Sequence, residues 1–200
     1  MHPSARTVME LYERHAVAWD AARPRSLVER SWLDRFRAAM AARGAVLDLG
    51  CGSGEPLAGH LIRYGHPVTG VDASPSLIGL AAGRFPDHRW IVHDMRGLAL
   101  GARFGGIMAW DSFFHLTRDD QRAMFPVFRA HAAPGAALLF TSGPSDGEAI
   151  GTFQGEALYH ASLDADRYRA LLAENGFELL GHAVEDETCG GRTVWLAKLS

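Results

Sequence analysis

The stretch VLDLGCGSGEP, residues 46–56, decides which fold this sequence can adopt. It begins as a short apolar strand that includes one acid, Asp48, and then places three glycines within five positions. Each glycine weakens a helix or strand by roughly 0.5–1 kcal/mol relative to alanine. A cluster of three therefore indicates that a ligand approaches the backbone closely in the turn between this strand and the helix that follows.

Apolar periodicity on both sides of this turn predicts an alternation of strands and helices. Before the turn, residues 5–20 and 26–42 have the pattern of two amphipathic helices. After it, strands and helices alternate as far as a strand at 136–142, and two final strands, 177–185 and 192–199, suit an antiparallel hairpin. This order predicts an α/β fold with a doubly wound, mostly parallel sheet, which the closing hairpin makes mixed.

The composition is that of an ordinary globular protein. The chain has 200 residues, 48% of them hydrophobic and 22% charged, with a formal net charge of −3. This length suits one domain, and no basic stripe indicates a nucleic-acid partner. No apolar run approaches the roughly 20 residues of a membrane span, and the N-terminus lacks the apolar core of a signal peptide. Because Cys51 and Cys189 suit reduced thiols, we expect a cytoplasmic protein. We also expect a monomer or homodimer without a membrane partner.

The glycine spacing and the neighbouring acid distinguish between two classes of ligand. A dinucleotide site has the spacing G-x-G-x-x-G, whereas here the third glycine comes one residue early. Asp48 would repel a pyrophosphate at this turn but would attract an ammonium group. The ligand is therefore expected to be amino-acid-like at one end and not phosphorylated.

Two further acids end the next two predicted strands. Asp72 follows Gly50 by 22 residues and is placed to accept hydrogen bonds from both hydroxyls of a ribose. Asp94 lies another 22 residues on, where its carboxylate can accept from the exocyclic amine of adenine. Taken singly, an aspartate at the end of a strand is often only a turn former. An ammonium, a ribose and an adenine together describe S-adenosylmethionine.

In these motifs the chain resembles the class I S-adenosylmethionine-dependent methyltransferases, of the small bacterial kind that act on small molecules. VLDLGCGSGEP resembles the first motif of that family, VDAS (71–74) its second, HDMRGL (93–98) its third and FGGIMAWDSFFHL (104–116) its fourth. The resemblance covers about residues 5–198. It implies a Rossmann-like seven-stranded mixed sheet in the order 3-2-1-4-5-7-6 with strand seven antiparallel, and S-adenosylhomocysteine as the product.

The resemblance also implies which residues surround the cofactor. Tyr12 and Trp19 are included because the first helix covers the cofactor in similar enzymes, although core packing explains their spacing equally well. The expected cofactor-binding residues are Tyr12, Trp19, Asp48, Gly50, Cys51, Gly52, Ser53, Gly54, Asp72, Ala73, Ser74, Asp94, Met95, Arg96 and Trp110. No histidine pair has the spacing of metal ligands, so no metal is expected.

In methyl transfer the protein mainly binds and orients the reactants, because the cofactor carries the reactive group. Aligning the donor with the acceptor can lower the barrier by roughly 7–11 kcal/mol, and a base is needed only where the acceptor must lose a proton. His115 is a candidate base, with a structural histidine at a helix start as the alternative. The candidates to face the methyl group come from the end of the fourth predicted strand, and they are Trp110, Asp111, Ser112 and His115.

Residues 143–162 form a 20-residue stretch without a clear period, which predicts no regular element. Loops of this length are usually lids or disordered, and the aromatic residues here argue against disorder. We therefore expect a lid over the acceptor pocket, with Tyr159 and the further catalytic candidate His160 pointing toward the methyl group. The alternative is a strand or turn packed at the sheet edge. One methyltransferase domain is thus expected, with a helical cap at 1–43 and a Rossmann-like core at 44–200.

Three functions are compatible with these residues. The first is a methyltransferase that acts on a small molecule, and the absence of an Asn/Asp-Pro-Pro-aromatic run argues against adenine or amide acceptors. The second is a nicotinamide-dependent oxidoreductase on the same architecture, against which the glycine spacing and Asp48 speak. The third is a protein that binds S-adenosylmethionine without catalysis, such as a sensor.

Overall fold

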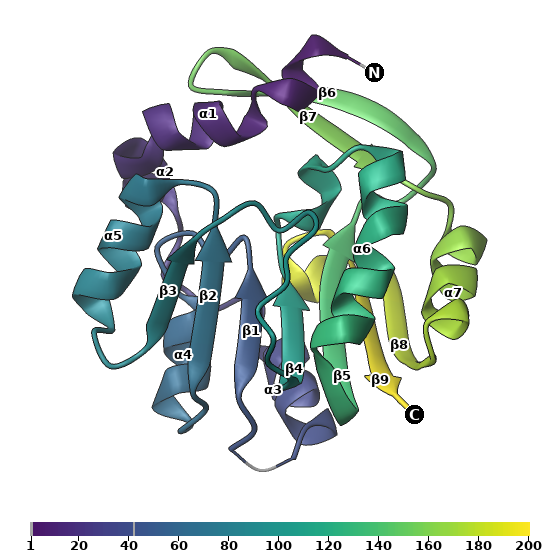
Figure 1. The fold of residues 1–200 in the computed structure, drawn as a ribbon. Helices are drawn as coiled ribbons and strands as arrows, with labels where there is room; N and C mark the ends of the chain where they lie inside the picture. The colour runs from purple at the N-terminus through teal and green to yellow at the C-terminus, as the bar shows by residue number, and fades with distance from the viewer. Residues whose placement is uncertain (1, 42) are drawn as a thin grey trace.

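The computed structural model describes residues 2–41 and 43–200, and its centre is a seven-stranded sheet (Figure 1). The strands are β1 (Val46–Leu49), β2 (Val68–Asp72), β3 (Arg89–Val92), β4 (Phe104–Ala109), β5 (Ala132–Ser142), β8 (Phe177–Asp186) and β9 (Arg192–Leu199). Their order is β3-β2-β1-β4-β5-β9-β8. β1 to β5 are parallel, whereas β9 is antiparallel to both of its neighbours. The predicted order and the antiparallel last strand are confirmed.

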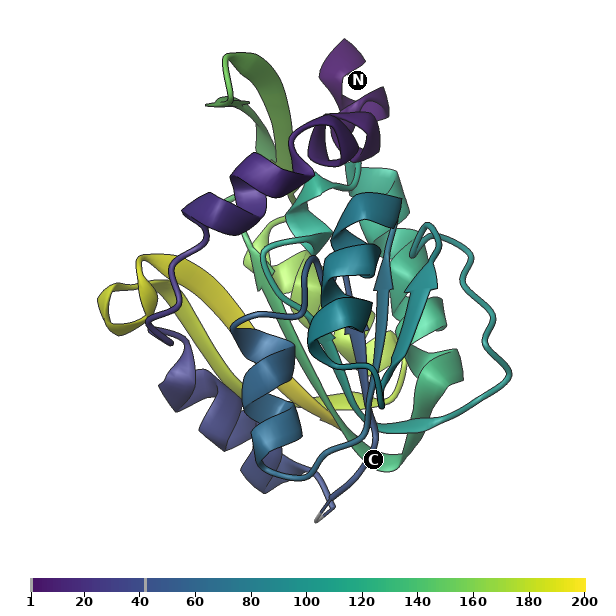
Figure 2. The same cartoon turned by 90° about the vertical axis from the view of Figure 1, so that its left-hand side faces the viewer.

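Helices cover both faces of this sheet (Figure 2). α3 (Arg30–Ala39) and α4 (Leu57–Arg63) pack on one face, α6 (Arg118–His131) and α7 (Ala165–Glu174) pack on the other, and α5 (Pro75–Arg84) lies along β2 and β3. Side chains alternate along a strand, so Val46 joins the core under α3 and α4 while Leu47 and Leu49 join the core under α6 and α7. No helix in the described part of the chain is long and apolar enough to cross a membrane.

The N-terminal region differs from the two long helices that the periodicity predicts. The first is divided into a 3₁₀ turn, η1 (Pro3–Arg6), and two short helices, α1 (Val8–Arg14) and α2 (Ala16–Ala22). The break falls at His15, whose φ of −109° and ψ of 17° lie outside the helical region. The second predicted helix becomes α3, which starts later than expected. It packs against the sheet face, whereas α1 and α2 lie above the carboxyl ends of the parallel strands (Figure 1).

The prediction of no regular element in residues 143–162 is wrong, because this segment contains an antiparallel hairpin. Its strands are β6 (Gly147–Phe153) and β7 (Glu156–Ser162). The two turn residues, Gln154 and Gly155, both have positive φ, +52° and +81°, as in a tight two-residue hairpin turn. Asn-Gly and Asp-Gly are the usual sequences of such turns, so a glutamine in the first position hid the hairpin from sequence analysis.

The hairpin and the N-terminal helices form one roof over the carboxyl ends of the strands. Their shared apolar cluster contains Val8, Leu11, Leu158, Tyr159 and Ala161. Polar contacts fix the roof to the rest of the chain, because the Glu13 carboxylate accepts hydrogen bonds from Ser74 and Ser76 at the start of α5. In doubly wound folds ligands bind at this edge of the sheet, so the roof covers the expected ligand site.

Candidate active site

A cavity of about 780 Å³ lies between the roof and the carboxyl ends of the strands. Ligand cavities of roughly 300–1,000 Å³ hold small molecules. Its walls come from the strand ends, from the roof and from the β8–β9 hairpin. The predicted site residues that line it are Tyr12, Trp19, Gly50, Gly52, Asp72, Ala73, Ser74, Asp94, Met95, Arg96, Asp111, Ser112, His115 and His160.

The glycine turn forms one wall of the cavity, and two of its glycines have no room for a side chain. Gly50 and Gly52 have positive φ values of +72° and +54°. A Cβ atom on Gly50 would lie 2.3 Å from the Cβ atom of Ser112, and one on Gly52 would lie 2.6 Å from the ring of Trp19. Both the backbone conformation and the close approach of other side chains therefore require glycine.

Asp72 ends β2 beside this turn, and backbone N–H groups hold its carboxylate in place. Gly52 donates to one carboxylate oxygen and Ser74 to the other, both at 2.9 Å. Burial raises the pKa of Asp72, although these hydrogen bonds oppose the shift. Each oxygen still has lone-pair capacity for a hydroxyl donor in the cavity.

Asp48 lies behind the turn and is not among the residues that line the cavity, so its predicted contact with the cofactor stays a prediction. It is 4% exposed, and no described residue donates a hydrogen bond to its carboxylate. Burial and the negative charge of Asp72 raise the pKa of Asp48 to about 7, and Arg23 only partly offsets them. A cation placed next to this carboxylate would therefore be stabilised.

Asp94 lines the cavity at the end of β3, but its carboxylate is already paired within the chain. The Arg96 guanidinium donates to it at 2.6 Å and 2.8 Å, and the Arg96 backbone N–H donates at 2.9 Å. Burial opposes the charged form, yet the Arg96 hydrogen bonds outweigh burial and lower the pKa of Asp94. Sequence analysis anticipated a carboxylate free for an amine and missed this pairing.

Four further predicted cofactor contacts, those of Cys51, Ser53, Gly54 and Trp110, also lie outside the cavity lining. Trp110 is 4% exposed and belongs to the core under α3 and α4. The prediction that its side chain faces the cavity is therefore wrong. The Ser53 hydroxyl bonds to Asp20, and the buried thiol of Cys51 lies beside β2. A Cβ atom on Gly54 would lie 3.1 Å from the ring of Trp90, so packing explains this glycine.

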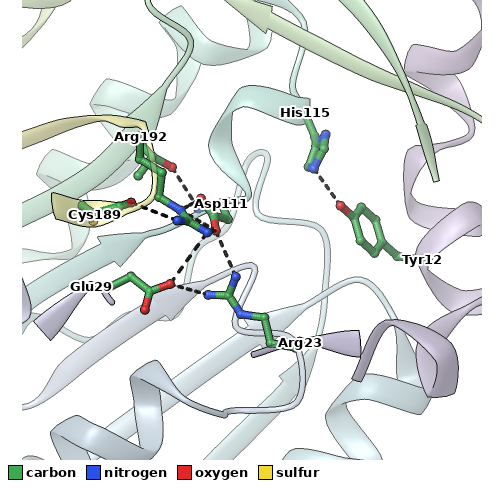
Figure 3. A network of polar contacts seen from close by, with 8 residues as sticks. Tyr12, Arg23, Glu29, Asp111, His115, Cys189 and Arg192 are labelled. Atoms are coloured by element: carbon green, nitrogen blue, oxygen red, sulfur yellow. Dashed lines mark hydrogen bonds and ion pairs between the residues drawn. The ribbon is translucent and has the colours of Figure 1, made fainter. Parts of the chain in front are cut away.

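An ion-pair network joins Asp111, which follows β4, to Arg23 and Arg192, and all three of these residues line the cavity (Figure 3). Arg192 donates to both oxygens of Asp111, at 2.9 Å and 2.8 Å, and Arg23 donates to Asp111 at 3.1 Å. Glu29, which is buried, accepts from Arg23 at 3.1 Å. The two guanidinium groups and the two carboxylates balance in charge. Removing one partner would leave a poorly compensated charge in a largely enclosed place.

A wall of aromatic and imidazole rings faces the network across the cavity. The hydroxyl of Tyr12 and Nε2 of His115 are 2.9 Å apart, and Nδ1 of His115 lies 2.8 Å from the backbone oxygen of Tyr159. The rings of His115 and His160 are 4.8 Å apart, and Phe114 packs against both. Tyr159 is fully buried in the roof cluster and does not line the cavity, contrary to the expectation that it points toward the methyl group.

Sequence analysis missed Arg23, Glu29 and Arg192. Arg23 and Glu29 lie in the connection between α2 and α3, and Arg192 opens β9. Arg192 is 81 positions from Asp111, so no local pattern relates them. The one local signal is that Arg23 lies between two predicted helices and Arg192 opens a predicted strand, whereas Glu29 falls inside the helix predicted at 26–42.

The doubly wound sheet, the glycine turn and the acids at or after the ends of β1, β2 and β3 have the arrangement that the class I methyltransferase motifs predicted. Residues 46–135 match the family model of the methyltransferase domain. No curated protein matches the sequence significantly.

Solved structures of methyltransferases share the fold over nearly the whole chain. The chain is similar to DhpI in its complex with SAH, with a TM-score of 0.76 and 19% identity over 100% of this chain and 98% of that one. It is similar to magnesium protoporphyrin IX methyltransferase (ChlM) from Synechocystis PCC 6803 with bound SAH, with a TM-score of 0.74 and 18% identity over 98% and 100%. It is also similar to SAM-bound CalS10, an amino pentose methyltransferase from Micromonospora echinaspora, with a TM-score of 0.71 and 20% identity over 94% and 96%.

At these identities the solved structures establish the fold, and the family match establishes what the central part of the chain is. Residues 46–135 are a methyltransferase domain, and nearly the whole chain has the fold of the solved S-adenosylmethionine-dependent methyltransferases. The fold class and the enzyme class predicted from the sequence are confirmed.

Proposed function

We propose that this protein transfers the methyl group of S-adenosylmethionine to a small molecule bound in the same cavity. The observation that carries the proposal is that one cavity is lined by both sets of residues. The glycine turn and Asp72 line one end of it, and the rings of His115 and His160 line the other. Its volume of about 780 Å³ suits a cofactor beside a small acceptor.

The residues at the first end fit the chemistry of the cofactor. Gly50 and Gly52 let a ligand approach the backbone, and the Asp72 carboxylate accepts the ribose hydroxyls. Asp48 supplies negative charge near the amino-acid end from just behind the turn. When bound, the cofactor supplies a methyl group on a positively charged sulfur, which departs as a neutral thioether.

The residues at the second end hold the acceptor and exclude water. The β6–β7 hairpin acts as the lid of the cavity and presents His160 to it. At its tip, Glu156 accepts hydrogen bonds from Arg14 and His15, which ties the hairpin to α1. A closed lid favours in-line alignment of donor and acceptor, which is the main catalytic contribution expected from this protein.

Two measurements test the proposal. Isothermal titration should show that S-adenosylmethionine and S-adenosylhomocysteine both bind, and that NAD does not. Incubation with a panel of small acceptors should then release S-adenosylhomocysteine with the acceptor that fits. Binding without release for every class of acceptor would favour a sensor, and binding of NAD alone would contradict the proposal.

We expect Asp72→Ala to weaken binding of S-adenosylhomocysteine by about tenfold to a hundredfold. The variant loses charge-assisted hydrogen bonds to the ribose, which contribute roughly 1.5–3 kcal/mol. Asp72→Asn keeps the shape and one acceptor oxygen, so its affinity should fall between those of the wild type and Asp72→Ala. Calorimetry measures the affinities, and unchanged affinity in Asp72→Ala would remove Asp72 from the cofactor site.

We expect His160→Ala to bind S-adenosylhomocysteine almost normally but to lose turnover by about tenfold or more. The imidazole lies on the acceptor side of the cavity, where positioning of the acceptor acts on rate. The measurement is methyl transfer to an acceptor found in the panel. His182→Ala is the matched control, because His182 stacks on Trp195 and does not line the cavity. Full turnover with a lowered melting temperature would leave His160 a packing role only.

A further inference from the structure

The hydrogen bond between Tyr12 and His115 has a direction, and that direction determines what the cavity can bind. Nδ1 of His115 faces the backbone oxygen of Tyr159, which can only accept, so Nδ1 carries the hydrogen. Burial lowers the pKa of His115 to about 4, so the ring is neutral at pH 7 and Nε2 has only a lone pair. The Tyr12 hydroxyl must therefore donate to Nε2, across 2.9 Å.

The oxygen of Tyr12 is consequently left as a hydrogen-bond acceptor. Tyr12 lines the cavity, and its ring points toward His115 from the N-terminal helix (Figure 3). Burial and the negative charges of Asp111 and Asp72 raise the pKa of Tyr12, so the phenol keeps its proton. With that proton directed to His115, the lone pairs of the oxygen are free to accept an N–H or O–H group from a ligand.

The charges of the cavity wall favour an amine over an anionic ligand. Among the described residues, the cavity is lined by three arginines, and each is within ion-pair distance of two carboxylates. An anionic group would have to compete with those carboxylates. Glu148 and Glu185 are exposed at the rim, in no ion pair within the described part of the chain, and they attract cations.

The weak bases in the cavity favour an amine over a hydroxyl. An alcohol must lose its proton to become an effective nucleophile, and a base is most effective when its pKa lies near the working pH. His115 has a pKa of about 4, and burial also lowers the pKa of His160. An amine that arrives as an ammonium first releases one proton to water, and its nitrogen then attacks with its own lone pair without a base in the cavity.

We propose that the methyl acceptor is an amine nitrogen whose N–H is accepted by the Tyr12 oxygen, with His115 orienting the hydroxyl. This inference rests on the proposed function and names the substrate class of the same site. The nitrogen lone pair forms the new N–C bond while the C–S bond breaks and its electron pair stays on sulfur. The ammonium product then releases a proton to water. Tyr12 thereby changes from an expected cofactor contact to an acceptor-binding residue.

The experiment compares two ligands that differ at the position of the transferred methyl group. Sinefungin carries an amine where S-adenosylmethionine carries its sulfonium methyl group, whereas S-adenosylhomocysteine has neither. We expect the wild type to bind sinefungin about tenfold more tightly, or better, because its amine donates to Tyr12. Tyr12→Phe should remove most of that preference. Calorimetry gives both dissociation constants in each variant, and their ratio cancels general effects on the cofactor site.

Tyr159→Phe is the matched control, because it removes a second hydroxyl from the same roof without touching the cavity, and its ratio should equal that of the wild type. The amine inference would be overturned if Tyr12→Phe left the ratio unchanged, or if the wild type showed no preference for sinefungin. In either case, binding of S-adenosylhomocysteine would still support the proposed function. Failure of all these ligands to bind would overturn both. Circular dichroism confirms that each variant is folded.

Discussion

Replacing Gly52 with valine is expected to abolish detectable binding of S-adenosylmethionine, a loss of at least about a hundredfold. Gly52 has a φ of +54°, a conformation that costs a β-branched residue roughly 1–3 kcal/mol. Its new Cβ atom would also lie 2.6 Å from the ring of Trp19, so α2 would have to shift and the wall of the cavity would change. Calorimetry and a thermal melt measure the affinity and the stability of the variant.

Gly101→Val is the matched control, because it strains the backbone without placing a side chain against the wall of the cavity. Gly101 also has positive φ, +65°, but nothing lies within 4 Å of a Cβ atom built there, and it does not line the cavity. This control should lose only the stability that the backbone strain costs and should keep its affinity for S-adenosylmethionine. Normal binding by Gly52→Val would show that the glycine turn is a structural element only.

Replacing Asp48 with asparagine is expected to change stability and affinity in opposite directions. The raised pKa of Asp48, about 7 against 3.8, means that ionising this buried group destabilises the ligand-free protein by up to about 4 kcal/mol at pH 8. We expect Asp48→Asn to raise the free energy of unfolding by about 1–3 kcal/mol. The gain is smaller than the cost of ionisation because the buried amide also loses its hydration. For a domain of this size each kcal/mol corresponds to about 2–4 °C in melting temperature.

The contribution of Asp48 to the stability of the protein depends on pH, because the folded and unfolded states bind its proton differently. Between about pH 4 and pH 7 the folded protein binds a proton at Asp48 that the unfolded chain releases, so this group lowers stability progressively as the pH rises through that window. Asp48→Asn removes this dependence, so its advantage over the wild type should be small near pH 4 and complete above pH 7. Thermal melts across this range measure it.

The same substitution is expected to weaken binding of S-adenosylhomocysteine by about tenfold to a hundredfold at pH 8, because the ligand's ammonium loses the attraction of a nearby buried negative charge. Adenosine, which lacks the amino-acid end, is the control ligand and should bind both proteins equally. A variant with a lower melting temperature and unchanged affinity would mean that Asp48 serves packing and not the cofactor.

The sheet and the cofactor end of the cavity were predictable because their signals are local. Parallel strands joined by right-handed crossovers place all of their carboxyl ends on one edge, so Asp72 and Asp94 had to approach the glycine turn. The position of Trp110 was also predictable, although it was assigned wrongly. Side chains alternate along β4, and Met108 and Trp110 therefore share the face that α3 covers.

The sequence by itself thus determined the fold class and the edge of the sheet at which a ligand is expected, since both follow from short-range periodicity and strand–helix order. The sheet order was implied by the resemblance of the motifs to the methyltransferase family. Only the tertiary structure decided the acceptor end. Tyr12 and His115 are 103 positions apart, and the ion-pair partners of Asp111 come from two other segments, the α2–α3 connection and the start of β9. These contacts depend on how α1 packs against the β6–β7 hairpin and on the path of the connection between α2 and α3. Such long-range packing leaves no periodic trace in the sequence, because it selects pairs of side chains and not a repeating pattern.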